Sequence, residues 1–209
     1  MITRKQLGII RPDLQVIADM INPDTRLLDV GCGDGALLDH LANFKQVDGR
    51  GIELSTEGVN ACVSAGLSVI QGDAETDLKD YPDQAFDYVV LSQTLQAMAA
   101  PKEVLADMLR IGERAIVSFP NFAYWRLRWQ ILTRGRMPVS RTIAFQWYDT
   151  PNIHFCTIKD FVILCEEMGI TIERSIALDR NGAKRRVRSA MFFANLFGEQ
   201  AVFLLSKQK

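Results

Sequence analysis

Three glycines between two apolar runs are the feature that most limits how this chain can fold. The stretch from Leu27 to Leu41 reads LLDVGCGDGALLDHL, with the glycines at Gly31, Gly33 and Gly35. The first apolar run has no alternation, which is typical of a strand buried on both faces, and the second has helical spacing. A glycine turn at this junction lets the backbone approach a ligand closely and points helix N–H groups at it. The stretch therefore predicts a ligand site at the end of a buried strand.

The same alternation of strand and helix runs along most of the chain. Strand patterns lie at 26–30, 47–54, 67–74, 86–93, 113–121, 170–178 and 199–208, and helical patterns lie at 11–21, 36–43, 55–66, 101–112 and 157–169. Strands that alternate with helices predict an α/β fold with a doubly wound, mostly parallel sheet. The last two strand patterns lack a full crossover helix between them, so we expect a terminal antiparallel hairpin.

Residues 122–155 interrupt this rhythm with an insertion rich in aromatic residues and arginine. We find no internal repeat and no low-complexity linker, and we therefore expect residues 1–209 to form one domain. Trp, Tyr and Arg are the residue types that anchor protein interfaces, so the insertion is either a partner-binding segment or a lid over the ligand site.

Composition excludes several classes of partner. The net charge is −1, which argues against nucleic acid or an anionic membrane as an obligatory partner. No apolar stretch approaches the roughly 20 residues of a membrane span, and the N-terminus lacks a signal-peptide pattern. The four cysteines have no metal-type spacing, so we expect no metal site and reduced thiols in a cytoplasmic protein.

Asp29 decides which ligand the glycine turn favours. Gly31, Gly33 and Ala36 also satisfy the dinucleotide spacing G-x-G-x-x-G/A. A carboxylate two residues before the first glycine would repel a pyrophosphate, but it would attract the sulfonium and amino groups of S-adenosylmethionine. The predicted cofactor is therefore S-adenosylmethionine, or its product S-adenosylhomocysteine.

Two more acids follow at successive strand ends. Glu53 lies about 20 residues beyond the glycines, where an acid can bind ribose hydroxyls, and Asp73 can accept from the adenine amine. As a ribose-binding residue, Glu53 is expected at an exposed strand end. The alternative is that each acid merely caps the following helix. The full set of predicted cofactor-binding residues is Asp29, Gly31, Cys32, Gly33, Gly35, Glu53, Leu54, Asp73, Ala74 and Ser92.

With these motifs, residues 11–121 resemble the class I S-adenosylmethionine-dependent methyltransferases. The resemblance implies a Rossmann-like sheet of seven strands with an antiparallel last strand, and with the cofactor over the strand ends. Its motifs are specific for the cofactor and weak for the reaction. The candidate acceptor-site residues include His154 and Asn121, of which His154 is the plausible imidazole base, yet a lone histidine is more often a packing residue.

Most of the chain also resembles the methionine biosynthesis protein MetW family. The segments that carry this resemblance are RPDLQVIADMI, RLLDVGCGDGALL, IEL, QGDAE, DYVVLSQTLQA, SFPNFAYW and NIHFCTIKDF. The resemblance implies an auxiliary protein that binds S-adenosylmethionine and supports a homoserine O-acyltransferase. Two alternatives stay open. One is a methyltransferase acting on a small molecule, and the other is an RNA methyltransferase suggested only by the basic run Lys184 to Arg188.

Overall fold

The computed structural model describes residues 10–187 and 191–208. The residues before Ile10 lie outside the described part of the chain, as does Arg188 at the end of the basic run. None of the helices in the described part combines the length and the apolar composition that a membrane crossing requires.

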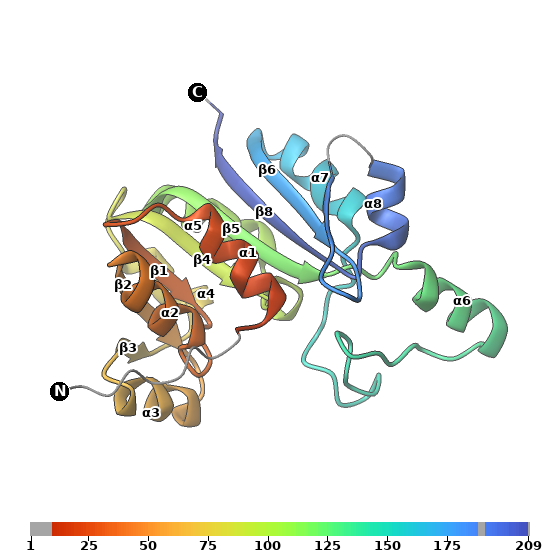
Figure 1. The fold of residues 1–209 in the computed structure, drawn as a ribbon, viewed down its shortest axis with the longest axis horizontal. Coiled ribbons are helices and arrows are strands. Elements are labelled where there is room, and N and C mark those ends of the chain that lie inside the picture. The colour runs from red at the N-terminus through yellow and green to blue at the C-terminus, as the bar shows by residue number, and fades with distance from the viewer. Residues whose placement is uncertain (1–9, 188–190, 209) are drawn as a thin grey trace.

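A single mixed sheet forms the centre of the molecule (Figure 1). Its strand order is β3-β2-β1-β4-β5-β8-β6-β7. The strands are β1 Arg26–Val30, β2 Asp48–Glu53, β3 Ser68–Gln71, β4 Phe86–Ser92, β5 Gly112–Pro120, β6 Ile170–Leu178, β7 Lys184–Arg186 and β8 Gln200–Lys207. The first five strands pair in parallel, and β8 pairs antiparallel with both β5 and β6. The predicted α/β fold with an antiparallel last strand is confirmed.

The described sheet has eight strands, one more than the resemblance implied. The additional strand is β7, in which three residues of the basic run pair antiparallel with the end of β6. All three residues of β7 are exposed. Cations on a short edge strand discourage pairing with another sheet, which gives the basic run a structural explanation.

Helices cover both faces of the sheet. The α-helices of the described residues are α1 Pro12–Met20, α2 Ala36–Lys45, α3 Thr56–Ser64, α4 Ala74–Asp77, α5 Pro101–Ile111, α6 Trp125–Arg134, α7 Ile158–Glu167 and α8 Met191–Phe197, with short 3-10 helices at Leu78–Asp80 and Leu95–Ala97. Successive strand residues point to opposite faces, so Leu27 belongs to the core that includes residues of α1 and α2, while Leu28 belongs to the core that includes residues of α5 and α7. The apolar cores on the two faces of the sheet hold β1, β2 and β4 in place. The carboxyl ends of these parallel strands therefore lie at the same edge of the sheet.

The aromatic and arginine-rich insertion leaves the sheet after β5. Helix α6 and the irregular segment that follows it extend away from the sheet, on the side of α8 (Figure 1). Tyr124, Leu127 and Ile143 form a small separate core, with Phe122 packed against it. The insertion therefore has its own packing, while much of its aromatic surface stays exposed.

Candidate functional site

The glycine turn follows β1 directly and is tied to the end of β2. The N–H groups of Gly31 and Cys32 donate to the carbonyl of Ile52, at 2.8 and 3.2 Å. Gly31, Gly33 and Gly35 have φ values of +69°, +58° and +77°. This left-handed backbone is easy only for glycine, which explains why three of them occur in five residues.

The three glycines differ in what surrounds them. A Cβ on Gly35 would collide with the side chains of Leu67 and Cys62, so Gly35 serves the packing of α2 against α3. A Cβ on Gly33 would meet nothing within 4 Å, and a Cβ on Gly31 would lie 3.1 Å from Oγ1 of Thr94. Gly33 is thus the position at which the turn is open to a ligand.

Asp29 lies in the middle of the parallel strands, opposite Gly51 of β2 and Val90 of β4. The residue is 2% exposed. Its Oδ1 atom is buried without a hydrogen-bond partner. Burial raises the pKa of Asp29 from 3.8 to about 7, the nearby Arg11 charge lowers it, and Glu53 adds to the rise. A buried carboxylate without a partner is costly, and such groups mark functional sites.

Glu53, the last residue of β2, braces two loops at once. Its Oε2 accepts from the N–H of Gly33 at 2.8 Å, and its Oε1 accepts from the N–H and the hydroxyl of Ser55 at 2.9 and 2.8 Å. Although partial burial alone would raise the pKa of Glu53, the N–H groups of Ser55 and Gly33 lower it overall. The side chain is half-buried, not exposed as the sequence suggested. Glu53 is therefore a carboxylate held beside the open glycine.

The other residues predicted at this edge lie around Asp73. This residue is exposed and caps α4, because its Oδ1 accepts from the N–H of Glu75 at 3.0 Å. Asp73 therefore caps the following helix, as the alternative explanation predicted, and it uses one of its two carboxylate oxygens to do so. Ala74 is buried, whereas the side chain of Leu54 is 68% exposed at the end of β2.

Cys32 is a buried thiol in the glycine turn. Its sulfur lies 4.0 Å from that of Cys62, whose thiol donates to the carbonyl of Gly33 at 3.4 Å. Burial, together with the nearby Asp29 charge, raises the pKa of Cys32 well above its usual range. The thiol therefore stays protonated and packs as a small apolar group. All four cysteines are free.

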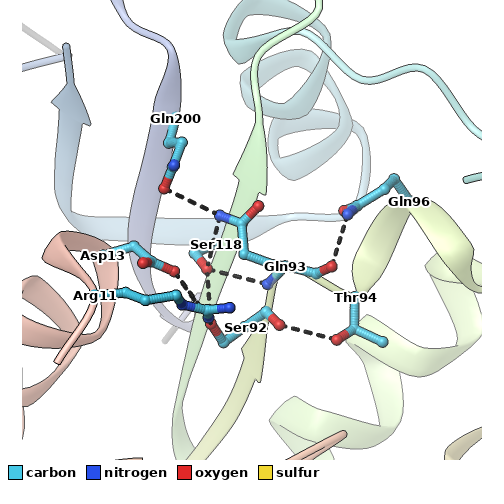
Figure 2. A network of polar contacts seen from close by, with 8 residues as sticks. All are labelled: Arg11, Asp13, Ser92, Gln93, Thr94, Gln96, Ser118 and Gln200. Carbon is cyan, nitrogen blue, oxygen red and sulfur yellow. Dashed lines mark hydrogen bonds and ion pairs between the residues drawn. The ribbon is translucent and has the colours of Figure 1, made fainter. Parts of the chain in front are cut away.

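Ser92, at the end of β4, is the centre of a polar network that sequence reasoning did not detect (Figure 2). The network contains Arg11, Asp13, Ser92, Gln93, Thr94, Gln96, Ser118 and Gln200. Ser92 Oγ accepts from Nη2 of Arg11 at 3.2 Å, and it lies 3.4 Å from Asp13 Oδ2 and 3.2 Å from Ser118 Oγ. The start of α1 is thereby joined to the ends of β4 and β5.

The loop after β4 is held in an unusual conformation. Gln93 has a φ of +57°, which is uncommon for a residue other than glycine. Its N–H donates to Ser118 Oγ at 3.1 Å, and its carbonyl accepts from Gln96 Nε2 at 2.6 Å. The Oε1 atom of Gln96 is buried without a partner. The strain and the orphan atom both lie beside Ser92, at the edge where ligands of such sheets bind.

Asn121 and His154 lie in very different surroundings. Asn121 is 0% exposed, and its amide makes four hydrogen bonds with main-chain groups of Asn195, Gly198, Ala123 and Ile158. No amide atom is left for a substrate, so this residue joins the end of β5 to α7 and α8. His154 is exposed, and its main-chain N–H donates to the carbonyl of Gln96 at 3.0 Å. Its imidazole has no hydrogen bond within the described residues.

The structure thus brings the predicted acids and glycines to one edge of the sheet. No group of three or more His, Cys, Asp or Glu side chains able to hold a metal ion occurs in the described part of the chain. The residues that sequence reasoning missed are Arg11 and Asp13 at the start of α1, and Ser118 in β5. The tripeptide RPD at the start of the first helical pattern was the available signal, but nothing local to it points to Ser92.

Comparison with known proteins gives one family over nearly the whole chain. The model of the family described as methionine biosynthesis protein MetW matches residues 11–205. A protein of Rhodopirellula baltica, described as bifunctional methionine biosynthesis protein MetXA/MetW, is 36% identical over an alignment of 182 positions, and the match covers 83% of this chain and 29% of that protein. The chain spans 29–32% of the length of the curated relatives it matches.

Solved structures share the fold at low sequence identity. A SAM-dependent methyltransferase from Archaeoglobus fulgidus superposes with a TM-score of 0.66 at 16% identity, over 93% of this chain and 91% of that one. The cyclase SpnF superposes with a TM-score of 0.64 at 19% identity, over 93% and 80%. The fold is therefore that of the SAM-dependent methyltransferases, and the same fold also occurs in a protein named for a different reaction.

Proposed function

Because the chain belongs to the methionine biosynthesis protein MetW family, we propose that it binds S-adenosylmethionine at the glycine turn and supports a homoserine O-acyltransferase. In this proposal residues 1–209 act as one S-adenosylmethionine-binding domain, with the insertion at 122–155 as its partner-binding part. The observation that carries the cofactor assignment is the buried, unpartnered Oδ1 of Asp29 beside an open Gly33.

The donor set fits this cofactor. Asp29 and Glu53 supply two negative charges near the turn, which suit a ligand with a sulfonium and an ammonium group. Gly33 leaves room for the backbone to contact the ligand's amino-acid part. A cation bound at the turn would also attract the buried Asp29 carboxylate and so favour its charged form. Cys32 and Gly35 shape the turn by packing and do not contact the ligand in this account.

The acids on the neighbouring strands complete the proposed site. A carboxylate has about four acceptor positions, and three of those on Glu53 are filled by Gly33 and Ser55. The ribose hydroxyls would take the remaining position and displace the Ser55 hydroxyl. Asp73 has one oxygen engaged in capping α4, so the other can accept from the adenine amine. Leu54 and Ala74 would pack on the adenine ring.

An auxiliary role is favoured over catalysis by the acceptor side of the site. When bound, the cofactor supplies an activated methyl group on its sulfonium. The chain's own residues hold and orient the ligand, but Asn121 is saturated by structural hydrogen bonds, and the exposed imidazole of His154 has no hydrogen bond within the described residues that would orient it as a base. Methyl transfer depends mainly on positioning, so the small-molecule methyltransferase remains the second candidate, supported by the fold.

The partner assignment rests on the relative from Rhodopirellula baltica. That protein's name joins MetXA to MetW in one bifunctional chain. The two parts of such a fused polypeptide are held close together at a high effective concentration. This arrangement supports the proposal that the present chain associates with a separate acyltransferase chain. The four free thiols suit a cytoplasmic protein.

The insertion supplies the surface for such a partner. Trp125, Trp129 and Leu132 on α6 are 40%, 59% and 78% exposed. Helix α6 also carries Arg126, Arg128 and Arg134, and it extends beyond the sheet where a second protein can reach it (Figure 1). Exposed aromatics with arginine are the composition of binding hot spots.

The test is association between purified proteins. The acyltransferase should bind the wild-type chain, and the double variant Trp125→Ala, Trp129→Ala should weaken that binding at least tenfold while leaving cofactor affinity unchanged. Phe44→Ala removes a similarly exposed aromatic from α2 and is the matched control. Absence of any complex would refute the partner assignment. Turnover of S-adenosylmethionine by the isolated chain, at roughly 1 per second or more on a cell metabolite, would favour the methyltransferase.

A further inference from the structure

We propose that the loop after β4, residues 93–97, couples cofactor binding at the glycine turn to the insertion at 122–155, with Gln96 as the residue that joins them. This inference rests on the proposed function and adds how the cofactor would act on the partner-binding surface. The loop contacts the turn on one side and holds the insertion on the other, and its own conformation is strained.

One side of the loop packs against the glycine turn. The hydroxyl of Thr94 donates to the carbonyl of Ser92 at 2.9 Å, which fixes the orientation of the Thr94 side chain (Figure 2). The Oγ1 atom of Thr94 lies 3.1 Å from the position that a Cβ on Gly31 would take, so there is little space between the loop and the turn. Because packed groups transmit small displacements, a ligand that shifts the turn also acts on the loop.

The other side of the loop holds the end of the insertion. The carbonyl of Gln96 accepts from the main-chain N–H of Ile153 at 2.9 Å and from that of His154 at 3.0 Å. Both donor residues are exposed, whereas Gln96 is 5% exposed. Main-chain hydrogen bonds to one buried residue, and not burial of their own side chains, therefore attach these two residues to the loop.

This attachment extends to helix α6, because the two ends of the insertion contact each other. The ring centroids of Phe122 and Phe155 lie 4.7 Å apart, and the N–H of Phe122 donates to the carbonyl of Cys156 at 3.1 Å. Phe122 also packs against the small core that contains Leu127 of α6. A displacement of residues 153–155 is therefore passed to the helix that carries the proposed partner-binding surface.

The loop has the features of an element with two arrangements. Gln93 has a φ of +57°, and its carbonyl accepts from Nε2 of Gln96 at 2.6 Å. The Oε1 atom of Gln96 is buried and has no partner among the described residues. Both features cost free energy in the present arrangement, so a second arrangement that relieves them lies within reach. A ligand that favours one of two such arrangements shifts their populations, which is what coupling between two sites requires.

Tryptophan fluorescence can measure this coupling without the partner. The three tryptophans of the chain, Trp125, Trp129 and Trp147, all lie in the insertion. A change in their emission therefore reports a response of the insertion and not of the turn. We expect S-adenosylhomocysteine to change the emission of the wild-type chain, with a midpoint equal to the dissociation constant that calorimetry gives for the same ligand.

Two variants interrupt the coupling at different points. Ile153→Pro removes an N–H that donates to Gln96, whereas Ile153→Ala removes the same exposed side chain, keeps the N–H and is the matched control. Gln96→Leu removes the side-chain bond to Gln93 and the unpartnered oxygen with little change in volume. Ile153→Pro and Gln96→Leu should lose most of the emission change, while Ile153→Ala keeps it. Their calorimetric affinity for S-adenosylhomocysteine should stay within about fivefold of wild type, the lower end of usual coupling factors.

The contradicting results are distinct from one another. A full emission change in Ile153→Pro and Gln96→Leu would overturn the coupling, as would a wild-type chain that binds S-adenosylhomocysteine without any change in emission. A larger loss of affinity in these variants would place the loop in the ligand site instead. If Gln96→Leu does not fold, Ile153→Pro decides, because its substitution is at an exposed position.

Failure of the proposed function gives other results. A wild-type chain that does not bind S-adenosylhomocysteine in calorimetry would refute the cofactor site and the coupling with it. Absence of a complex with the acyltransferase would refute the partner assignment alone, because the emission change needs no partner.

Discussion

The N–H of Gly33 donates a 2.8 Å hydrogen bond to Oε2 of Glu53, which joins the second glycine of the turn to the last residue of β2. The same carboxylate holds Ser55, the residue that caps α3. The backbone of the turn and the acid that follows β2 are therefore one connected unit. A ligand that spans both would find them already aligned, which lowers the entropy cost of binding.

Replacement of Glu53 should affect both binding and stability. Glu53→Ala removes the acceptor for three hydrogen bonds and for the ribose hydroxyls. We expect a loss of about 1–3 kcal/mol in S-adenosylmethionine affinity by calorimetry, and of about 1–2 kcal/mol in the free energy of unfolding without ligand. Glu57→Ala, at an exposed position in the first turn of α3, is the control and should change neither. Unchanged affinity in Glu53→Ala would remove this residue from the site.

Asp29 should make stability depend on pH. Its folded pKa of about 7 exceeds the ordinary 3.8, so between about pH 4 and 7 the folded state keeps a proton that the unfolded state has lost. Raising the pH through this window therefore destabilises the wild-type protein. Asp29→Asn should lack that loss, with a gain on the order of 4 kcal/mol at pH 8, reduced by the cost of burying the amide.

Denaturation of both proteins from pH 4 to pH 8 gives the measurement for Asp29. The difference in free energy of unfolding between Asp29→Asn and wild type should grow up to about pH 7 and then stay level. S-adenosylmethionine should bind the wild type more tightly as the pH rises through 7, because a cationic ligand favours the carboxylate, and Asp29→Asn should lose this dependence. A pH-independent stability difference would show that Asp29 is ionised normally in the folded protein.

Gly33 and Gly35 should respond differently to the same substitution. Gly33→Val fills space that is open in the structure, so it should abolish cofactor binding with a stability loss of only about 1–2 kcal/mol from the left-handed backbone. Gly35→Val adds a collision with Leu67 and Cys62, so its loss of stability should be clearly larger. Thermal melting and calorimetry on the two variants test this contrast. Normal binding by Gly33→Val would refute the turn as the ligand site.

Asn121 should prove structural. Asn121→Ala leaves buried main-chain groups of α7, α8 and the loop after β5 without partners, and it should cost at least about 3 kcal/mol of unfolding free energy. Asn60→Ala on the exposed side of α3 is the control. A variant of Asn121 with normal stability and altered ligand chemistry would return this residue to the list of catalytic candidates.

The elements that local patterns determine could be predicted from the sequence. The helical pattern at 55–66 is present as α3, which Ser55 caps because its hydroxyl accepts from the N–H of Gly58. The parallel pairing of the first five strands follows from their alternation with helices. Asp29 lies inside β1, Glu53 is the last residue of β2 and Asp73 follows β3, so their positions relative to the parallel strands follow from the strand patterns of the sequence.

Contacts between distant segments could not be predicted in this way. Arg11 donates a hydrogen bond to Ser92, which lies 81 residues later in the sequence, and no periodicity in either segment predicts this contact. The saturation of Asn121 likewise depends on α8, which enters the structure about 70 residues later. The left-handed backbone of Gln93 is imposed by Ser118 and by the loop, against the preference of a non-glycine residue. Tertiary structure decides such details, and they determine which candidates can act.

The most direct test of the proposed function is the activity of the homoserine O-acyltransferase, assayed alone and with a saturating amount of this chain, each with and without S-adenosylmethionine. We predict that the chain changes acyltransferase activity, and that S-adenosylmethionine alters the activity only when the chain is present. Such an effect requires the ligand to bind the free and complexed chain with different affinities. Identical acyltransferase activity with and without the chain, at every S-adenosylmethionine concentration, would contradict the proposal.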